Sequence, residues 1–288
     1  MSLARDLVAL TKPRITTIVL ATSGAGLFMA PGTIESWKLA LSIVGTVLVV
    51  SAANALNMWW ERELDGKMDR TKKRPLPSGR MQPKTALFFG LGLGLVAAPM
   101  LFAVNALTGA LGLFALLSYV VVYTPLKRHT PFALQVGAVP GAIPPLLGWT
   151  SVTGHLDTGG LVLFALLFLW QVPHFIAISL FRAEDYARAG LKVYGVTRSD
   201  RSAKATIILY TALLVALSVA PMSLGLANGR YLVIAMLAGA MFFGLTLRGL
   251  RPATDTVANH RWARSVFGYS ILYLLVVLGS LLAFRIEA

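Results

Sequence analysis

Residues 39–69 read LALSIVGTVLVVSAANALNMWWERELDGKMD, an apolar run that passes directly into an acidic one. The apolar part, 39–60, has no charged side chain and is long enough for a helix to cross the roughly 30 Å hydrocarbon core of a bilayer. Glu61 begins the acidic part with no glycine or proline in between. The stretch therefore predicts a membrane-spanning helix that carries charged chemistry at one end.

The rest of the chain repeats this apolar character. Of its 288 residues, 56% are hydrophobic and only 13% are charged, whereas soluble domains average about 25% charged residues. This composition excludes an ordinary soluble protein and indicates a membrane protein surrounded by lipid. The net charge of +14 would suggest nucleic-acid binding in a soluble chain, but Lys and Arg in cytoplasmic loops explain it here, so we expect no nucleic-acid partner.

Nine apolar runs are long enough to be membrane spans, so we expect an all-α bundle of about nine transmembrane helices. The runs are 14–30, 39–60, 86–104, 106–124, 132–150, 160–181, 206–226, 230–248 and 264–284. Two short connections, at 104–106 and 227–229, leave open a single kinked helix in place of two spans. The absence of cysteine excludes disulfides, thiolate metal sites and a cysteine nucleophile.

The positions of Lys and Arg test this arrangement. With the N-terminus in the cytoplasm, 23 of the 26 basic residues lie in segments that nine spans leave on the cytoplasmic side. Only Lys38, Arg230 and Arg285 lie on the other side. This asymmetry favours nine spans with the C-terminus outside. No long polar insert interrupts the chain, so residues 1–288 are expected to form one domain in the cytoplasmic (inner) membrane.

Asn57, Glu61 and Asp65 are spaced by four residues, so on a helix their side chains share one face. Two carboxylates and an amide are hard oxygen ligands, and Mg²⁺ is commonly held by one or two carboxylates together with substrate phosphates. The row fits a Mg²⁺-bound diphosphate better than a closed metal cage. Arg70 and Arg74 follow closely and are candidates for neutralising phosphate charge.

A plainer explanation is that this segment is a solvated cytoplasmic loop. For its Lys and Arg residues alone that explanation is the better one, because positive charge is enriched in such loops. Topology does not require acidic residues, however, and an amide inside an apolar span is costly without a role. We therefore interpret Asn57, Glu61 and Asp65 as functional.

A second polar segment begins within the run 160–181 and ends in the other long loop. Gln171 and His174 lie at membrane depth, beside a proline that frees helix backbone groups. A single histidine in a bundle is most often an interhelical hydrogen-bonding residue. Glu184 and Asp185 follow in the loop and are candidates for a second cation site that faces the first.

The run 106–124 ends in Tyr119 and Tyr123, which are followed by Lys127 and Arg128. Aromatic residues at a membrane interface usually serve as belt residues. Two tyrosines four residues apart also suit another role, with their rings beside a developing allylic cation and the two basic residues beside a departing diphosphate. These residues alone leave both interpretations open.

Together these motifs resemble the UbiA-type membrane prenyltransferases. Asn57-x₃-Glu61-x₃-Asp65, followed by Arg70-Thr71 and Arg74-Pro75, is similar to the first motif of that family. The motifs that resemble its haem-farnesylating subgroup are Lys12-Pro13-Arg14, Leu126-Lys127-Arg128-x-Thr130, Gly141-Ala142-x-Pro144-Pro145-x-x-Gly148-Trp149, and Trp170-Gln171-x-Pro173-His174-Phe175 with Asp185-Tyr186. They occur in the family's order over roughly residues 10–200, which makes the resemblance more specific than any one motif.

The resemblance implies an enzyme that transfers the farnesyl group of farnesyl diphosphate to a vinyl group of haem b and adds a hydroxyl, giving haem O for terminal oxidases. Magnesium is the implied cofactor and haem b a substrate; haem-oxidase assembly proteins are candidate partners. The active site is expected on the cytoplasmic side. The implied roles are metal binding for Asn57, Glu61, Asp65 and Asp185, cation shielding for Tyr119 and Tyr123, and substrate binding for Arg70, Arg74, Lys127, Arg128, Arg188 and His174.

Two features depart from the family pattern. Glu61 stands where the general pattern has Asp, which keeps the carboxylate. The stretch 190–195, GLKVYG, differs from the Pro-Met-Leu-Pro type of sequence expected there, so the resemblance does not define the geometry of the second loop. Two alternative functions are prenylation of a quinone precursor or other aromatic acceptor, and non-enzymatic membrane transport. A transporter should show internal repeats with broken helices at mid-membrane, and the sequence shows none.

Overall fold

The computed structural model describes residues 2–250 and 255–286, and the regular structure in these ranges is helical apart from one isolated β-bridge between Ala227 and Arg285. The helices are α1 (Leu3–Leu10), α2 (Pro13–Met29), α3 (Ser36–Trp60), α4 (Arg62–Asp65), α5 (Pro83–Val104), α6 (Ala106–Leu117), the π-helix η1 (Ser118–Tyr123), α7 (Thr124–Leu126), α8 (Ala133–Thr153), α9 (Thr158–Phe181), α10 (Ala183–Arg188), α11 (Tyr194–Thr197), α12 (Asp200–Leu217), α13 (Ala220–Ser223), α14 (Gly229–Leu247), the 3₁₀-helix η2 (Arg248–Leu250) and α15 (Thr256–Ala283). The expected all-α fold is confirmed.

Each of the nine predicted runs coincides with a long helical segment, in two cases a segment made of consecutive helices. In the described part of the chain, seven segments are long and apolar enough to cross a membrane. The other two are α2, which has 17 residues, and α8, which contains three prolines. The chain is therefore a multi-pass membrane protein, and the expected number of nine spans is approximate at α2 and α8.

Both short connections are breaks between helices. Asn105 is extended between α5 and α6, and its side chain accepts a hydrogen bond from a backbone N–H in the first turn of α6 at 2.8 Å. Phe102 of α5 packs on Gly109 of α6, so the two helices lie against each other. Residues 224–228 separate α13 from α14, and Asn228 caps α14 in the same way.

The outer surface of the bundle is apolar. Phe88 and Leu95 of α5 are 68% and 76% exposed, and Leu237 of α14 and Leu275 of α15 are 63% and 66% exposed. Soluble monomers rarely expose contiguous apolar surface of this kind, whereas lipid tails cover it at no cost. The exposed side chains thus agree with the membrane location that composition predicts.

Glycines bring three helices close together at the centre of the bundle. A Cβ at Gly26 of α2 would overlap the carbonyl oxygen of Pro145 on α8, and a Cβ at Gly148 of α8 would overlap a carbonyl of α2. On the same helix, Gly141 leaves room for the amide of Gln171 on α9. Small residues at crossing points are the usual means of close helix packing in membranes.

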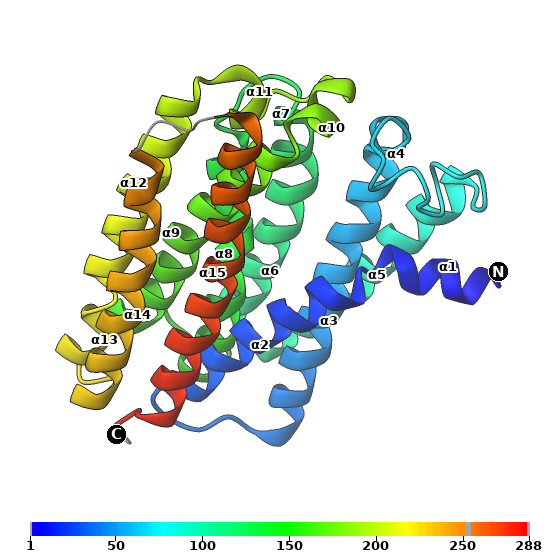
Figure 1. Cartoon of the computed structure of the whole chain (residues 1–288). Coiled ribbons are helices and arrows are strands. Elements are labelled where there is room, and N and C mark those ends of the chain that lie inside the picture. The colour runs from blue at the N-terminus through cyan, green and yellow to red at the C-terminus, as the bar shows by residue number, and fades with distance from the viewer. Residues whose placement is uncertain (1, 251–254, 287–288) are drawn as a thin grey trace.

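The loops gather at two opposite ends of the bundle (Figure 1). At one end, here called the charged end, α4, α10 and α11 lie together, and Arg188 pairs with Asp69 across two loops. At the other end, Arg285 donates a hydrogen bond to a carbonyl of α2. The loops predicted to be cytoplasmic thus meet at the charged end; Arg251, which belongs to the same group of basic residues, lies outside the described residues.

Candidate active site

Asn57, Glu61 and Asp65, here called the acidic row, lie where α3 gives way to α4 at the charged end. The Glu61 N–H donates to the Asn57 carbonyl at 2.9 Å, and the Asp65 N–H donates to the Glu61 carbonyl at 2.8 Å. These bonds continue the helical pattern past the end of α3, so the three side chains stay on one face. The residues are only 3%, 7% and 2% exposed. Buried carboxylates require compensating partners.

Each member of the acidic row has a basic partner, two of them from segments distant in sequence and one from the same loop. The pairs are Lys12 Nζ with Asn57 Oδ1 at 3.1 Å, Lys127 Nζ with Glu61 Oε1 at 2.5 Å, and Arg74 Nη1 with Asp65 Oδ2 at 2.7 Å. Glu61 Oε1 is buried. Its contact with Lys127 is an ion pair that lacks hydrogen-bond geometry among the described residues. Three basic side chains therefore surround the row before any ligand binds.

Lys12 was not singled out as a site residue from the sequence. It has a left-handed backbone, with φ 48° and ψ 65°, which is unfavourable for a side chain with a Cβ and is found mainly where surrounding structure enforces it. Burial lowers the pKa of Lys12 to about 7; repulsion from Arg74 and Lys127 acts in the same direction, and attraction to Glu61 and Asp65 opposes it. With this backbone conformation, the Lys12 side chain contacts Asn57 of the row.

A single turn of π-helix, η1, connects α6 to α7 and locally widens this helical segment. Such turns are frequent at functional sites. The ring centroids of Tyr119 and Tyr123 lie 5.1 Å apart, and Lys127 Nζ lies 4.7 Å from the centroid of Tyr123. Tyr123 packs on Gly137 of α8, where a Cβ would overlap its ring. Tyr123 therefore adjoins the acidic row through Lys127, and Tyr119 packs on Tyr123.

Thr124, the residue after η1, fixes the orientation of the Asn57 amide. The Thr124 hydroxyl donates to the Tyr119 carbonyl at 2.8 Å and lies 3.1 Å from Asn57 Nδ2. Because a hydroxyl has one proton, the Thr124 oxygen acts as the acceptor in its contact with Asn57. Nδ2 therefore faces Thr124 and Glu61, and Oδ1 faces Lys12. Asn57 therefore presents its amide oxygen, which is the atom able to bind a metal ion, on the side of Lys12. Thr124 was missed because a threonine at the end of an apolar run has no distinguishing spacing.

Two loops meet at the charged end: the first loop, residues 61–82 between α3 and α5, and the second loop, residues 182–199 between α9 and α12. Asp185, on α10 of the second loop, contacts the first loop through Asp69. The Asp69 N–H donates to Asp185 Oδ1 at 3.3 Å. Arg188 donates to both carboxylates, at 2.6 Å from Asp69 Oδ2. Glu184 is exposed. The structure therefore joins the two acidic loops through Asp69, which lies four residues beyond Asp65 and was not among the predicted site residues.

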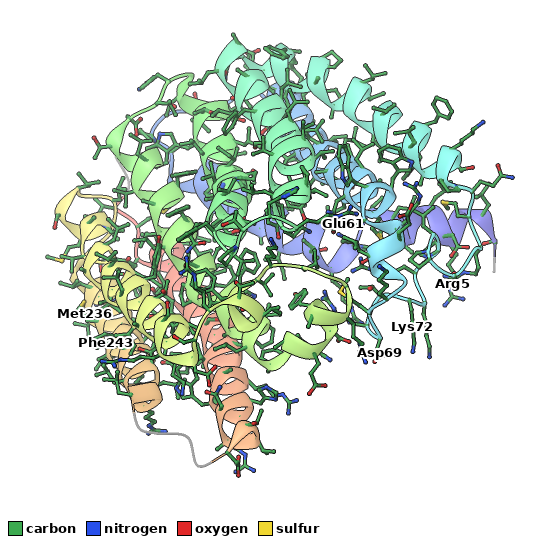
Figure 2. The ribbon with its side chains drawn as sticks, turned by 90° about the horizontal axis from the view of Figure 1, so that it is seen from above. Arg5, Glu61, Asp69, Lys72, Met236 and Phe243 are labelled. Atoms are coloured by element: carbon green, nitrogen blue, oxygen red, sulfur yellow. The ribbon has the colours of Figure 1, made fainter. Side chains whose placement is uncertain are left out.

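Apolar side chains hold the two loops together beneath these charges. The buried cluster consists of Leu64 and Met68 from the first loop and Ala189, Leu191 and Val193 from the second. Leu191 and Val193 belong to the stretch 190–195 that departs from the family pattern, and their burial gives that stretch a packing role. Seen from above, Glu61, Asp69 and Lys72 lie on one side of the molecule, across the bundle from Met236 and Phe243 of α14 (Figure 2).

His174 lies on α9, against α15. Its Nδ1 is 2.7 Å from the hydroxyl oxygen of Ser270, so it does join two helices by a hydrogen bond. The imidazole stacks on Trp170 with ring centroids 4.7 Å apart, and its centroid lies 4.8 Å from that of Phe267. Ser270 carries no sequence signal of its own, since serine is common in packed membrane helices.

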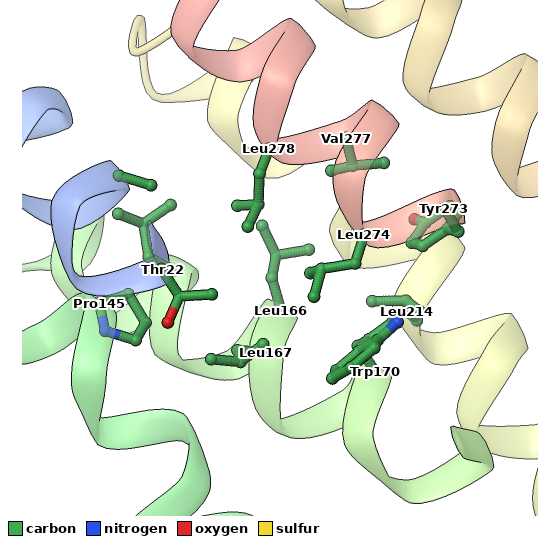
Figure 3. Close-up of a pocket in the computed structure, with 12 residues that line it drawn as sticks. Thr22, Pro145, Leu166, Leu167, Trp170, Leu214, Tyr273, Leu274, Val277 and Leu278 are labelled. Atoms are coloured by element: carbon green, nitrogen blue, oxygen red, sulfur yellow. The ribbon is translucent and has the colours of Figure 1, made fainter. Parts of the chain in front are cut away.

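An apolar pocket lies between α2, α8, α9, α12 and α15 (Figure 3). Thr22, Pro145, Leu167, Trp170 and Leu274 are among the side chains that line it. Trp170 belongs both to this pocket and to the stack on His174. The lining of the pocket is almost wholly apolar and is therefore unsuited to an ion.

The acidic row fits Mg²⁺ that arrives with phosphate ligands. Among the described residues, no three His, Cys, Asp or Glu side chains are grouped to hold a metal ion. The row instead supplies two carboxylates and an amide oxygen, and Mg²⁺ commonly takes one or two carboxylates together with phosphate and water. The buried Glu61 Oε1, which Lys127 Nζ contacts at 2.5 Å, is one suitable ligand atom. Arg70 and Arg128 are exposed and form no ion pair within the described residues.

Comparison with known proteins gives this site a family. Residues 19–282 match the model of the UbiA prenyltransferase family. The chain belongs to this family of membrane prenyltransferases. Within it, the chain is 49% identical over 275 residues to a protein named "Protoheme IX farnesyltransferase" from Myxococcus xanthus (strain DK1622), with 95% of this chain and 92% of the relative covered. Other relatives of that name are 40% to 54% identical.

Solved structures support the same fold. A structure of digeranylgeranylglyceryl phosphate synthase matches with a TM-score of 0.83 at 16% identity and covers 99% of both chains. A UbiA homolog from Archaeoglobus fulgidus, bound to GPP and Mg²⁺, matches with a TM-score of 0.67 at 14% identity, covering 94% of this chain and 100% of the homolog. The predicted family and fold are confirmed, and membership in a family of enzymes removes the transporter alternative.

Proposed function

We propose that this chain transfers the farnesyl group of farnesyl diphosphate to a vinyl group of haem b and adds a hydroxyl, forming haem O. The observation that carries the proposal is the buried acidic row with its three cations, in a chain 40% to 54% identical to relatives named Protoheme IX farnesyltransferase. The row suits the diphosphate of the donor, and the aromatic surroundings of His174 suit the flat acceptor.

Asn57, Glu61 and Asp65 would hold Mg²⁺ together with the diphosphate. The Archaeoglobus homolog bound to GPP and Mg²⁺ supports this combination of ligands. When bound, Mg²⁺ stabilises the negative charge of the diphosphate as a Lewis acid. Asp185 is the candidate ligand for a second ion, because its loop is joined to the first loop at Asp69.

Lys12, Arg74 and Lys127 bind the departing diphosphate in this proposal. In the ligand-free protein they pair with the acidic row, and on substrate binding they contact phosphate oxygens, which are also anionic acceptors. The C1–O bond of farnesyl diphosphate breaks and its electron pair goes to the diphosphate. Cations already aimed at the leaving group lower the cost of this charge separation. The exposed Arg70 and Arg128 attract the diphosphate at the rim.

Tyr119 and Tyr123 shield the farnesyl cation that remains. Aromatic faces stabilise a neighbouring positive charge, and the apolar bundle delays capture of the cation by water. The vinyl π electrons of haem b then form a bond to C1 of the farnesyl group, and positive charge moves to the vinyl carbon next to the porphyrin. Water adds to that carbon and loses a proton to solvent, which leaves the hydroxyl group.

The charged end is proposed to face the cytoplasm from the inner membrane. It collects the basic loops that the positive-inside bias assigns to that side. Farnesyl diphosphate and haem b are both amphipathic, so both can present a polar end at this surface while their apolar parts remain in the bundle. Haem-oxidase assembly proteins are the proposed recipients of the product.

Mass spectrometry of extracted haems tests the function. Membranes that contain this protein are incubated with haem b, farnesyl diphosphate and Mg²⁺, with EDTA as the control. We expect a Mg²⁺-dependent product heavier than haem b by one farnesyl group and one hydroxyl. Release of diphosphate with an aromatic acceptor, without formation of a new haem, would show that haem b is not the acceptor. No reaction with any acceptor, in protein shown to be folded, would overturn the function.

A further inference from the structure

Two ways of holding haem b are open to His174: ligation of the iron, or a hydrogen bond to a propionate. We propose that His174 Nε2 is an axial ligand of the haem iron, that Ser270 fixes the imidazole tautomer for this role, and that Arg264 binds a propionate. The inference rests on the proposed function, since haem b is the acceptor there.

The hydrogen bonds of Ser270 determine which imidazole nitrogen carries the proton. Ser270 Oγ donates to the Phe267 carbonyl at 2.6 Å and lies 2.7 Å from His174 Nδ1. In the proposed arrangement the one proton of Ser270 stays directed at this carbonyl, and the Ser270 oxygen accepts from Nδ1–H. A neutral imidazole protonated on Nδ1 has its lone pair on Nε2. That nitrogen can ligate iron, but it cannot donate a hydrogen bond to a carboxylate.

The ring is also fixed in position, as a metal ligand must be. Trp170 stacks on one side of His174 at an interplanar angle of 27°, and Phe267 packs with its centroid 4.8 Å away. The Trp170 indole N–H donates to the Ser270 carbonyl at 2.6 Å, so the same serine is held through its backbone as well. Histidines that ligate metals commonly donate their other N–H to such a fixed acceptor. Nε2 makes no hydrogen bond within the described residues.

The contacts continue from this ring toward the charged end. Phe267 packs edge-on against Phe181 at 5.7 Å, and the guanidinium carbons of Arg264 and Arg182 lie 5.7 and 5.9 Å from the centroid of Phe181. We call this set the α9–α15 seam; it consists of Trp170, His174, Phe181, Arg182, Arg264, Phe267 and Ser270. The seam therefore offers a nitrogen ligand at membrane depth and positive charge at its outer end.

Arg264 is the better propionate partner of the two arginines. Arg182 lies 3.8 Å from the buried Asp185, whereas Arg264 is exposed and forms no ion pair in the described part of the chain. Positions 174 and 181 are separated along α9 by about 10 Å of helix rise. This separation is comparable with that between the iron of a porphyrin and its propionate carboxylates. Haem b would thus lie along the seam with its carboxylates at the charged end.

Spectroscopy of bound ferric haem b tests the iron ligand in the purified full-length protein. We expect the wild type to show the absorption and electron paramagnetic resonance of imidazole-ligated haem, and His174→Gln to lose them. Glutamine keeps a hydrogen-bond donor but supplies no ligand nitrogen, and added imidazole should restore the spectrum. His129→Gln, at an exposed loop residue, is the matched control. Binding of farnesyl diphosphate with Mg²⁺ should be unchanged in His174→Gln, which also shows that the variant is folded.

Ser270→Ala tests the positioning role with His174 still present. Loss of a residue that orients a metal-ligating histidine typically lowers metal affinity about 10-fold to 100-fold, so haem affinity should fall by that factor. Ser270→Thr, which restores the hydroxyl, should recover the affinity. An unchanged haem spectrum and affinity in Ser270→Ala would overturn this role.

Haem b dimethyl ester separates propionate binding from iron ligation. Arg264→Gln should weaken binding of haem b about tenfold, a typical loss for one charge-assisted contact, and leave binding of the ester unchanged. Arg261→Gln, at an exposed arginine on the same helix, is the control. Equal weakening of both ligands would overturn the propionate contact.

The inference and the proposed function fail in different ways. If His174→Gln keeps the wild-type haem spectrum while the wild type makes the farnesylated haem, the iron assignment is wrong and the function stands. If the folded wild type neither binds haem b nor converts it, the proposed function is wrong and the inference fails with it.

Discussion

The acidic row and the α9–α15 seam are two polar regions of one bundle, and different interactions hold their functional side chains. In the row, the side chains of Glu61 and Asp65 are charged and held by cations within 2.7 Å. In the seam, His174 is held by a serine hydroxyl and two aromatic rings, and no charged side chain in the described part of the chain contacts it. Buried charges need counter-charges, whereas a buried neutral imidazole needs a hydrogen-bond partner that fixes the position of its proton. The difference matches an ionic leaving group on one side and a flat, largely apolar acceptor on the other.

Both regions nevertheless use a hydroxyl side chain to orient a functional group. Thr124 and Ser270 each commit their hydroxyl proton to a backbone carbonyl of their own helix, so each oxygen acts as an acceptor for a functional side chain. Thr124 orients the Asn57 amide, and Ser270 orients the His174 imidazole. If the two regions act separately, substitutions in one should leave ligand binding at the other intact.

The largest expected effect is that of Asp65→Asn. This change removes a charge from the row and leaves Arg74 without its partner, so turnover should fall at least about 10²-fold to 10³-fold, as when one electrostatic contact to a leaving group is lost. The ferric haem b spectrum should not change. Product formation and haem titration measure the two effects in the same preparation.

Glu63→Gln is the matched control, because Glu63 lies between the two row carboxylates in sequence but its side chain is 77% exposed. We expect nearly normal turnover from it. Normal turnover from Asp65→Asn would remove this carboxylate from the metal site, and a changed haem spectrum would show that the two regions are coupled.

Thr124→Val should have the next largest effect. Valine has a similar shape but no longer accepts from the Asn57 amide, whose nitrogen is then held in place by Glu61 alone. The Mg²⁺ concentration needed for half-maximal binding of farnesyl diphosphate should rise about 10-fold to 100-fold, and Thr124→Ser should restore it. Calorimetric titration at several Mg²⁺ concentrations measures this without turnover. Equal affinities for all three proteins would contradict the orienting role.

Spacing was sufficient to predict the acidic row because the helical hydrogen bonds continue through Glu61 to Asp65. The sequence also offered Arg74 and Lys127 as site residues, but two further partners of the row, Lys12 and Thr124, were beyond such reasoning. Lys12 lies 45 residues from Asn57 and Thr124 lies 67 residues from it, and only tertiary packing brings them together. The π-turn also places the Thr124 hydroxyl on the carbonyl five residues earlier, which a regular α-helix does not predict.

The fold was more accessible than the site. Apolar run length and the distribution of Lys and Arg predicted the helical bundle and which loops share an end, since both patterns reflect the bilayer directly. Gly26 and Gly148 show what these patterns omit: the close crossing of α2 and α8 depends on backbone contacts at two glycines, and neither run length nor charge distribution reveals such contacts.

Lys12→Met should weaken binding of farnesyl diphosphate about tenfold, since one charge-assisted contact to the diphosphate is lost while Arg74 and Lys127 remain. Haem b binding should be unaffected if the row and the seam are independent. Equilibrium binding of both ligands measures the contrast. Arg14→Gln, at an exposed residue two positions away, should leave both affinities unchanged. Unchanged binding of the diphosphate to Lys12→Met would place Lys12 outside the binding site.

The smallest expected effect is that of Arg188→Gln at the junction of the two loops. The Arg188 and Asp69 side chains are 52% and 59% exposed, and exposed ion pairs contribute little to stability. Hydrogen bonds from Lys72 and Arg188 lower the pKa of Asp69 below its ordinary value. The contribution of the pair is therefore present above the unfolded-state pKa of about 3.9 and is lost as the pH falls through the lower folded-state value.

Thermal unfolding of wild type and Arg188→Gln should consequently differ slightly and by the same amount between pH 5 and 8, and the difference should shrink near pH 3. A large loss of stability at neutral pH would mean that Arg188 acts mainly on the buried Asp185, which it also contacts. Asp185 would then be a buried charge that depends on its counter-charge, as Glu61 and Asp65 do. The second loop would belong with the acidic row, and His174 of the seam would stand alone as the functional side chain held without a counter-charge.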